Sequence, residues 1–249
     1  MHGLKIDLEK ARSSRLGPAL KFKAASDIER QLILADVPFA GDDLDEGALD
    51  SRRIFDIVAS IALIIILAPV LLLIALMIQL SDPGPLLFAH TRVGRGGRLF
   101  RCWKFRSMCV DAETRLQALI ETDSRIRAEW ERGYKLASDP RVTRVGNWLR
   151  VSSLDELPQL VNVLLGSMTL VGPRPVVTAE IGQYGRFAHY YLGLKPGLTG
   201  LWQVTGRSSV TYQRRVAADV LYARRRSVGL DLKILAATVP AVLLGRGAC

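Results

Sequence analysis

One uninterrupted apolar run dominates the hydrophobic pattern of this chain. The run, Ile57–Leu80, is 24 residues long, carries no charged side chain and lies between Asp56 and Asp82. A helix needs about 20 apolar residues to cross the hydrocarbon core of a bilayer. The run begins too far into the chain, and is too long, for a secretory signal peptide. It predicts a membrane helix, and the alternative is a buried helix of a soluble protein, which is usually shorter.

Two features of this run complicate a simple transmembrane span. Pro69 lies near its middle, where proline removes a backbone donor and clashes with the preceding turn, so a kink or break is expected. Basic residues flank the run on both sides, and the positive-inside rule would place both flanks in the cytoplasm. The residues alone leave two topologies open. One is a helix–break–helix hairpin that enters and leaves the same leaflet, and the other is a kinked single span with the N-terminal tail outside.

The pattern of the remaining residues predicts short elements. The β-type residues of Leu86–Arg106 surround the glycine-rich stretch Gly94–Gly97 and predict a β-hairpin. Helical apolar spacing covers 111–133, and further helices are expected at 146–150, 153–165 and 176–190. Two more helices are expected within 212–245, either at the membrane interface or packed on the core. The predicted fold class is therefore α+β, mainly helical, with a small β-hairpin and one N-terminal membrane helix.

Charge is distributed unevenly. The 249 residues include 34 Lys and Arg against 24 Asp and Glu, a net charge of +10. The net charge is −3 over 1–50, +6 over 51–110 and +7 over 111–249. Such a field suits nucleic acid, an anionic membrane surface or a phosphorylated substrate, and the apolar run favours the last two. The four tryptophans show no regular spacing with arginine, which argues against nucleic acid.

The chain has few cysteines, and their spacing shows no paired motif. Cys102, Cys109 and Cys249 are odd in number and lack the CxxC spacing of a zinc site. We interpret them as free thiols. Together with the apolar run, this composition argues against a disordered chain, a disulfide scaffold and a simple soluble enzyme.

The stretch 150–160 carries the candidate chemistry, because it holds two adjacent carboxylates, Asp155 and Glu156. Ser153 and Glu156 match a helix-capping box, in which Glu156 would bind a backbone N–H and Asp155 would complement the helix dipole. In the functional alternative, a carboxylate in the first turn of a helix is favoured in its ionised form and attacks phosphorus. The second carboxylate would then hold Mg²⁺, and Arg150 would bind a phosphate oxygen. The local pattern leaves both open.

Two clusters follow downstream. Pro173 and Pro175 fix the backbone around Arg174, and a rigid loop that presents a guanidinium suits a phosphate or a nucleotide. An ordinary turn with a solvated arginine is the alternative. A second cluster, 195–207, mixes turn residues with Trp202, Gln203 and Arg207. Each cluster alone is weak evidence for a function.

Taken in order, the motifs over roughly 51–249 resemble the bacterial sugar transferase family, the small monotopic phosphoglycosyl transferases, and most of all its exopolysaccharide galactosyl- and glucosyl-phosphate transferases. The motifs are Arg53…Phe55-Asp56…Pro69, Lys104-Phe105-Arg106-Ser107-Met108, Asp139-Pro140-Arg141-Val142-Thr143, Leu149-Arg150, Leu154-Asp155-Glu156-Leu157-Pro158-Gln159-Leu160, Val171-Gly172-Pro173-Arg174-Pro175 and Pro196-Gly197-Leu198-Thr199-Gly200.

The resemblance implies an activity. Members move a hexose 1-phosphate, galactose or glucose, from a UDP-sugar to undecaprenyl phosphate with release of UMP, as the first membrane step of exopolysaccharide assembly. By this resemblance Asp155 forms a covalent phosphosugar intermediate, and Asp155 and Glu156 bind the Mg²⁺ cofactor. The implied substrate and phosphate contacts are Lys104, Arg106, Arg150, Arg174, Gln203 and Arg207.

The resemblance also implies an organisation. It implies a re-entrant membrane helix broken at Pro69 (51–82), followed by a catalytic domain with interfacial helices (83–249) that faces the cytoplasm from the inner membrane. The residues before this region, 1–50, are themselves expected to form a flexible tail. The implied partners are the UDP-hexose, the polyprenyl phosphate and membrane lipids, without nucleic acid, and self-association into a homo-oligomer is left open. Two rival functions are a non-catalytic membrane-anchored basic module that binds anionic lipid or nucleic acid, and a membrane-bound UDP-sugar hydrolase.

Overall fold

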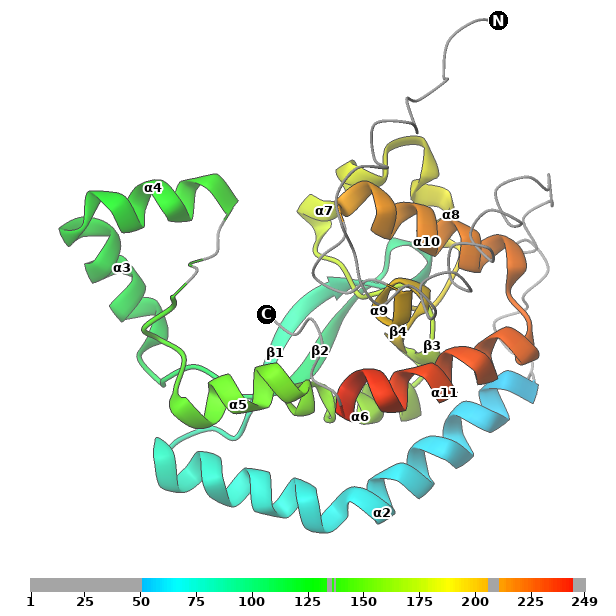
Figure 1. Cartoon of the computed structure of the whole chain (residues 1–249), viewed down its shortest axis with the longest axis horizontal. Helices are drawn as coiled ribbons and strands as arrows, with labels where there is room; N and C mark the ends of the chain where they lie inside the picture. Colours follow the sequence, from blue (N-terminus) through cyan, green and yellow to red (C-terminus); the bar gives the residue numbers. More distant parts are fainter. Residues whose placement is uncertain (1–50, 134–135, 137, 206–210, 244–249) are drawn as a thin grey trace, which may run out of the picture. The chain divides into compact units, whose positions relative to one another are not determined.

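The computed structural model describes residues 51–133, 136, 138–205 and 211–243, all of which belong to one compact unit. The fold is α+β and mainly helical, as predicted, with a small antiparallel hairpin and one long apolar helix (Figure 1). The expectation of a flexible tail over 1–50 lies outside the described residues.

The apolar run forms the helix α2 (Ser51–Ser81), which continues through Pro69 and bends part-way along its length (Figure 1). Within the described part of the chain it is the one helix that is long and apolar enough to cross a membrane. Only 11% of its most apolar window is buried inside the protein. A core helix of a soluble protein would be mostly covered, so the exposed apolar surface indicates association with a membrane.

Polar residues at the start of α2 join it to the globular part of the chain. Arg53 donates hydrogen bonds to the backbone carbonyls of Val163 and Leu164. The buried carboxylate of Asp56 accepts hydrogen bonds from the hydroxyl of Thr169 (2.7 Å) and the backbone N–H of Leu170 (3.0 Å). These bonds connect the start of α2 to α6 (Gln159–Leu164) and β3 (Thr169–Val171), and they give the buried carboxylate of Asp56 its partners, so they fix this end of α2.

The predicted hairpin is confirmed. Strands β1 (Leu87–Val93) and β2 (Leu99–Phe105) pair antiparallel and are joined through the 3-10 turn η1 (Arg95–Gly97). Gly96 and Gly97 have φ angles of 64° and 80°, a left-handed region that glycine enters without a steric penalty. The glycines that predicted the turn are therefore the residues that make it.

A second sheet was not predicted. Strands β3 (Thr169–Val171) and β4 (Gly197–Thr199) pair parallel and are only three residues long each. Strands this short show no readable alternation of apolar and polar residues. They place the loop that contains Arg174 next to the loop that begins at Lys195, because Gly172 lies beside Gly197.

The remaining elements are short helices. The expected helix over 111–133 is two helices, and Asp123 separates them by accepting a hydrogen bond from the backbone N–H of Arg125 (2.8 Å). The other predicted helical regions are confirmed with different bounds. The elements are α3 (Ala112–Thr122), α4 (Ser124–Gly133), α5 (Arg144–Ser152), η2 (Leu154–Glu156), α6 (Gln159–Leu164), α7 (Thr178–Tyr184), η3 (Gly185–Phe187), α8 (Ala188–Leu192), α9 (Leu201–Thr205), α10 (Tyr212–Arg225) and α11 (Val228–Leu243).

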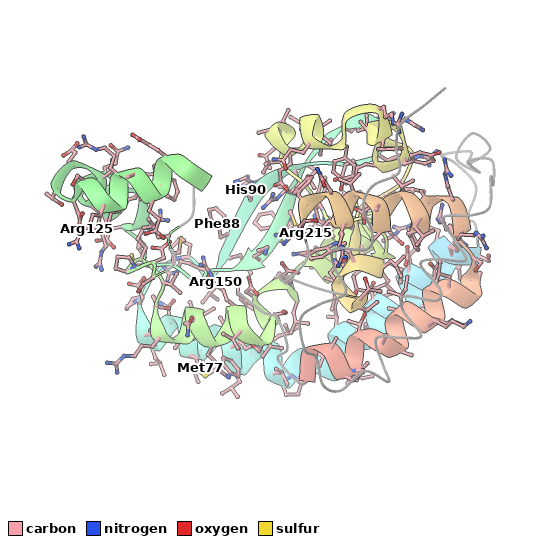
Figure 2. The ribbon with its side chains drawn as sticks, turned by 45° about the horizontal axis from the view of Figure 1, so that its top comes forward. Met77, Phe88, His90, Arg125, Arg150 and Arg215 are labelled. Carbon is pink, nitrogen blue, oxygen red and sulfur yellow. The ribbon has the colours of Figure 1, made fainter. Side chains whose placement is uncertain are left out.

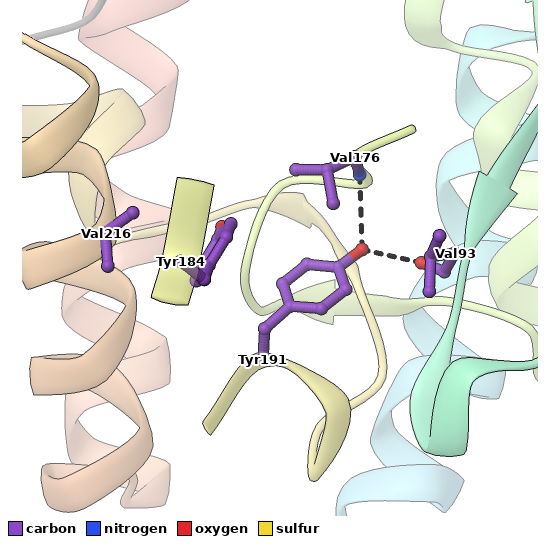
Figure 3. Close-up of a cluster of buried hydrophobic side chains, with 5 residues drawn as sticks. All are labelled: Val93, Val176, Tyr184, Tyr191 and Val216. Carbon is purple, nitrogen blue, oxygen red and sulfur yellow. Dashed lines mark hydrogen bonds between the residues drawn. The ribbon is translucent and has the colours of Figure 1, made fainter. Parts of the chain in front are cut away.

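Two buried clusters hold the two ends of the hairpin. At the turn end, Val93 packs with Val176, Tyr184, Tyr191 and Val216 (Figure 3). The hydroxyl of Tyr191 donates to the carbonyl of Val93 (2.6 Å) and accepts from the N–H of Val176 (3.2 Å). This hydroxyl therefore joins β1 to the segment that follows Arg174.

At the open end of the hairpin, Phe105 packs with Ile74 and Ile78 of α2 and with Leu149 of α5. Burial of such apolar side chains stabilises the fold by roughly 1.5–3 kcal/mol each. The residue before Phe105 is Lys104, so this cluster fixes the position of one of the predicted site residues.

We predict that Gly146→Ala destabilises the protein strongly. A Cβ atom on Gly146 of α5 would lie 1.9 Å from the backbone oxygen of Ser107, so α5 must move away from that segment. Overpacking of this kind costs about 1–3 kcal/mol or more, and thermal melting of the purified protein in detergent measures it. Gly182→Ala in α7 is the matched control, because nothing lies within 4 Å of its Cβ position. Equal melting temperatures for the two variants would contradict the proposed packing.

Candidate active site

Asp155 and Glu156 lie in the tight turn η2, between α5 and α6. The turn begins at Ser153, whose φ of 58° ends α5 in a left-handed conformation while its N–H donates to the carbonyl of Arg150 (3.2 Å). The side chain of Ser153 makes no capping hydrogen bond. The capping-box interpretation of Ser153 and Glu156 is therefore wrong, because the carboxylate of Glu156 binds a different partner.

That partner is Lys104, which β2 presents to both carboxylates. Its Nζ donates to Oε1 of Glu156 at 2.6 Å and lies 3.6 Å from Oδ2 of Asp155. The side chains of Asp155, Lys104 and Glu156 are 10%, 25% and 33% exposed, so water screens this cluster only partly. Two carboxylates and one ammonium from segments far apart in sequence thus form one charged cluster.

The two carboxylates differ in their protonation equilibria. Burial raises the pKa of Asp155 above its ordinary value, although Lys104 and Arg150 oppose this shift. For Glu156 burial acts in the same direction, but Lys104, Arg174 and Arg92 outweigh it and hold the pKa below its ordinary value. The sequence argument expected a helix terminus to favour ionised Asp155. Because the residue lies in a 3-10 turn and is buried, its ionised form depends on Lys104 and Arg150 instead.

Arg150 lies in the last turn of α5 (Figure 2), close enough to Asp155 for its charge to lower the pKa of that carboxyl. Its Nε donates to the hydroxyl of Ser107 at 2.9 Å. Ser107 also accepts a backbone hydrogen bond from Thr143, the N-cap of α5. The segment after β2 therefore positions both α5 and the guanidinium that lies near Asp155.

Arg174 lies between its two prolines and is half-buried. Within the described residues its guanidinium has no hydrogen bond or ion pair, and it lies over the ring of Trp202, 5.8 Å from the centroid. Arg215 lies 4.7 Å from the centroid of the same ring. A half-buried guanidinium without an acceptor is suited to bind an anion from outside the protein.

The structure places the other predicted contacts less directly. Arg106 donates to the backbone carbonyl of Asp82, just after α2, and its Nη2 lies 3.7 Å from the carboxylate of Asp82. In the described part of the chain it makes no contact with the Asp155–Glu156 pair. Gln203 follows Trp202 in α9, and its buried Oε1 has no partner among the described residues. Arg207 lies outside the described residues.

A sequence family described as bacterial sugar transferase matches residues 48–245.

The chain belongs to this family.

Several curated relatives of the family are similar to most of the described chain. The UDP-galactose-lipid carrier transferase of Erwinia amylovora is 47% identical over 197 residues, which cover 79% of this chain and 41% of that protein. The exopolysaccharide production protein ExoY of Sinorhizobium fredii is 45% identical over 197 residues, covering 79% of this chain and 87% of that protein. The UDP-glucose:undecaprenyl-phosphate glucose-1-phosphate transferase of Escherichia coli is 41% identical over 196 residues, covering 76% of this chain and 39% of that protein. This sugar transferase chain thus spans about two-fifths of the length of some relatives and most of the length of others.

The carboxylates of this family member could bind Mg²⁺ together with substrate phosphates. Proteins often hold Mg²⁺ through one or two carboxylates together with substrate phosphates. In the described residues no group of three or more His, Cys, Asp and Glu side chains could hold a metal, but Asp155 and Glu156 supply the required pair. Lys104 contacts one oxygen of each.

Sequence reasoning missed three residues near this cluster. Arg92 on β1 contributes to the lowered pKa of Glu156, and its Nη1 lies 3.7 Å from Oε1 of Glu180 on α7. Cys102 shares the hairpin face of Lys104, and burial raises the pKa of its thiol to about 11, so it is a neutral free thiol as expected. Strand alternation from Lys104 would have found Cys102, and the hairpin register would have found Arg92.

Proposed function

We propose that this sugar transferase moves a hexose 1-phosphate from UDP-galactose or UDP-glucose to undecaprenyl phosphate, releases UMP, and so begins exopolysaccharide assembly. The observation that carries the proposal is the contact of Lys104 with the adjacent, partly buried carboxylates of Asp155 and Glu156. The names of the relatives supply the substrate classes, since they act on UDP-hexoses and lipid or undecaprenyl-phosphate carriers.

In the first step an oxygen of Asp155 attacks the β-phosphorus of the UDP-sugar. A bond forms between that oxygen and phosphorus, and the bond from phosphorus to the bridging oxygen breaks. The electron pair stays on the bridging oxygen, which leaves as part of UMP, so no proton transfer is needed. The hexose 1-phosphate is then covalently attached to Asp155.

In the second step a phosphate oxygen of undecaprenyl phosphate attacks the same phosphorus, and the bond to Asp155 breaks with its electron pair returning to the carboxylate. Splitting the reaction in this way lets one nucleophile serve two substrates in turn. Lys104 fixes the carboxylates and neutralises part of their charge, and Arg150 and Arg174 bind phosphate oxygens. We also propose that Asp155 and Glu156 hold Mg²⁺, which when bound screens the repulsion between the carboxylate and the diphosphate.

The exposed apolar helix supports a position for this reaction at a membrane. Both ends of α2 contact the same globular unit, because Arg53 and Asp56 bind it near the start and Asp82 binds Arg106 beyond the last turn. A helix held in this way enters and leaves a bilayer on one side. We therefore propose the re-entrant topology, with the bend associated with Pro69 inside one leaflet and the catalytic domain on the cytoplasmic face of the inner membrane.

The first test replaces the nucleophile. Asp155→Asn should lower UMP release from UDP-galactose and UDP-glucose, in the presence of Mg²⁺ and undecaprenyl phosphate, by at least about a thousandfold, because an amide cannot form the acyl phosphate. Asp111→Asn is the matched control, since the side chain of Asp111 is 54% exposed and forms its ion pair with the nearby Arg115. Near-normal turnover of Asp155→Asn would show that Asp155 is not the nucleophile. Sustained UMP release without the lipid would indicate a hydrolase.

The second test concerns pH. Lys104 lowers the pKa of Asp155, so Lys104→Met should raise that pKa further. The ionised nucleophile is then lost at a higher pH, and the acid limb of the rate profile for UMP release should move toward alkaline pH. Lys104→Arg keeps the charge and should leave the limb near its wild-type position. An unchanged acid limb in Lys104→Met would show that Lys104 does not govern the ionisation of Asp155.

The third test concerns topology. In a background without native cysteines, Asp45→Cys and Arg98→Cys place one label before α2 and one after it. The re-entrant helix predicts that both are protected from a membrane-impermeant maleimide in intact cells and react after permeabilisation. Labelling at position 45 in intact cells would instead establish a single span with the tail outside.

A further inference from the structure

We propose that Arg92 is a further phosphate contact of this site, which binds the phosphate leaving as UMP, and that Glu180 is the internal anion which that phosphate displaces. The inference rests on the proposed function and names two residues that sequence reasoning did not assign. It follows from the register of the hairpin, from the loop that carries Arg174 and from the geometry of the Arg92–Glu180 pair.

The hairpin register places Arg92 and Lys104 on the same face. Arg92 is opposite Phe100 and Lys104 is opposite Phe88, and residues two apart in a strand share a face. The four residue steps from Phe100 to Lys104 span about 13 Å. Long side chains from these two positions both act on Glu156, whose pKa both lower. Arg92 and Lys104 therefore lie along one strip of the hairpin, with the nucleophile at the Lys104 end.

A second guanidinium is held near Arg92 by the core. The N–H of Val93 donates to the carbonyl of Val176 at 2.9 Å, and the hydroxyl of Tyr191 binds the same two residues (Figure 3). Val93 in this junction follows Arg92 on β1, and Val176 lies two residues after Arg174 in the loop that precedes α7. Burial and then Arg174 lower the pKa of Arg92, so the two cations disfavour each other. An anion between them would relieve that repulsion.

Glu180 is a weak partner for Arg92. Their closest charged atoms, Nη1 and Oε1, are 3.7 Å apart, beyond hydrogen-bond distance, and the two side chains are 17% and 26% exposed. A phosphate can instead accept two short parallel hydrogen bonds from one guanidinium. Replacement of the Glu180 carboxylate by a phosphate on Arg92 is therefore favourable. Until a phosphate binds, Glu180 keeps the guanidinium of Arg92 in place.

The position of Arg92 identifies which phosphate it binds. Asp155 and Lys104 face the β-phosphorus that is attacked, so a cation further along the hairpin faces the phosphate on the nucleotide side. That phosphate gains negative charge as the bridging bond breaks. A contact that strengthens as charge develops accelerates the chemical step and also binds the product.

The test measures UMP binding to the full-length protein in detergent by calorimetry, together with steady-state UMP release. Arg92→Gln should weaken UMP binding by about tenfold and lower kcat, because a charge-assisted contact is lost. Glu180→Gln should tighten UMP binding by roughly two- to threefold, because the competing anion is gone. The double variant should match Arg92→Gln, since Glu180 acts only through Arg92. Arg125→Gln on α4 (Figure 2) is the control, with a side chain that is 94% exposed.

The opposite signs of the two effects separate this inference from a structural ion pair. If the pair only fastened β1 to α7, both variants would lower the melting temperature and weaken UMP binding together, which would overturn the proposal. If Arg92→Gln binds UMP as tightly as the wild type, the proposal is also overturned. In that case turnover by the wild-type protein would still support the transferase function. Absence of UMP binding and of turnover in the wild type would instead remove the proposed function itself.

Discussion

The ammonium group of Lys104 and the carboxylates of Asp155 and Glu156 form the contact on which the other parts of this structure depend. Charges that water screens only partly are costly unless they are paired, and Lys104 and Glu156 are 52 positions apart in sequence. Several local features bring them together. Phe105 fixes the end of β2 in the core, the left-handed Ser153 ends α5 just before η2, and Gly146 lets α5 approach the segment after the hairpin.

The membrane helix is joined to this cluster through the same packing. Ile74 and Ile78 of α2 lie against Phe105, the neighbour of Lys104, while most of the remaining apolar surface of α2 is uncovered. The depth of the helix in a bilayer would therefore set the height of the Lys104–Asp155–Glu156 cluster above it. In the proposed reaction one substrate is a lipid phosphate, whose reactive group stays at the membrane surface. A rigid connection between α2 and β2 would hold the nucleophile at that height.

The sequence predicted the parts of the fold that depend on local pattern and the site residues that belong to ordered motifs. The glycines of the hairpin turn and the spacing of the last two helices identified their elements because each acts within a few residues. Partner choice was not predictable in this way. The capping-box pattern at Ser153 was wrong since a lysine from β2 takes the carboxylate of Glu156, and Arg106 contacts Asp82 because both lie where α2 meets the hairpin. The Arg92–Glu180 pair could not be predicted either, because no local sequence pattern relates β1 to α7.

Carboxylates offset much of the positive charge around the candidate site. The cations near the catalytic turn lie beside a comparable number of carboxylates, namely Lys104, Arg92, Arg150 and Arg174 beside Asp155, Glu156 and Glu180. Without these carboxylates, the cations would repel one another in a partly buried space and would lose their fixed positions. The carboxylates therefore help to hold Lys104 and Arg92 in place, whereas Arg174 is positioned by its flanking prolines and lies over the ring of Trp202. In the proposed reaction the net charge of +10 would attract the anionic substrate from a distance. Of the internal carboxylates only Glu180 would be displaced, because Asp155 and Glu156 take part in the reaction.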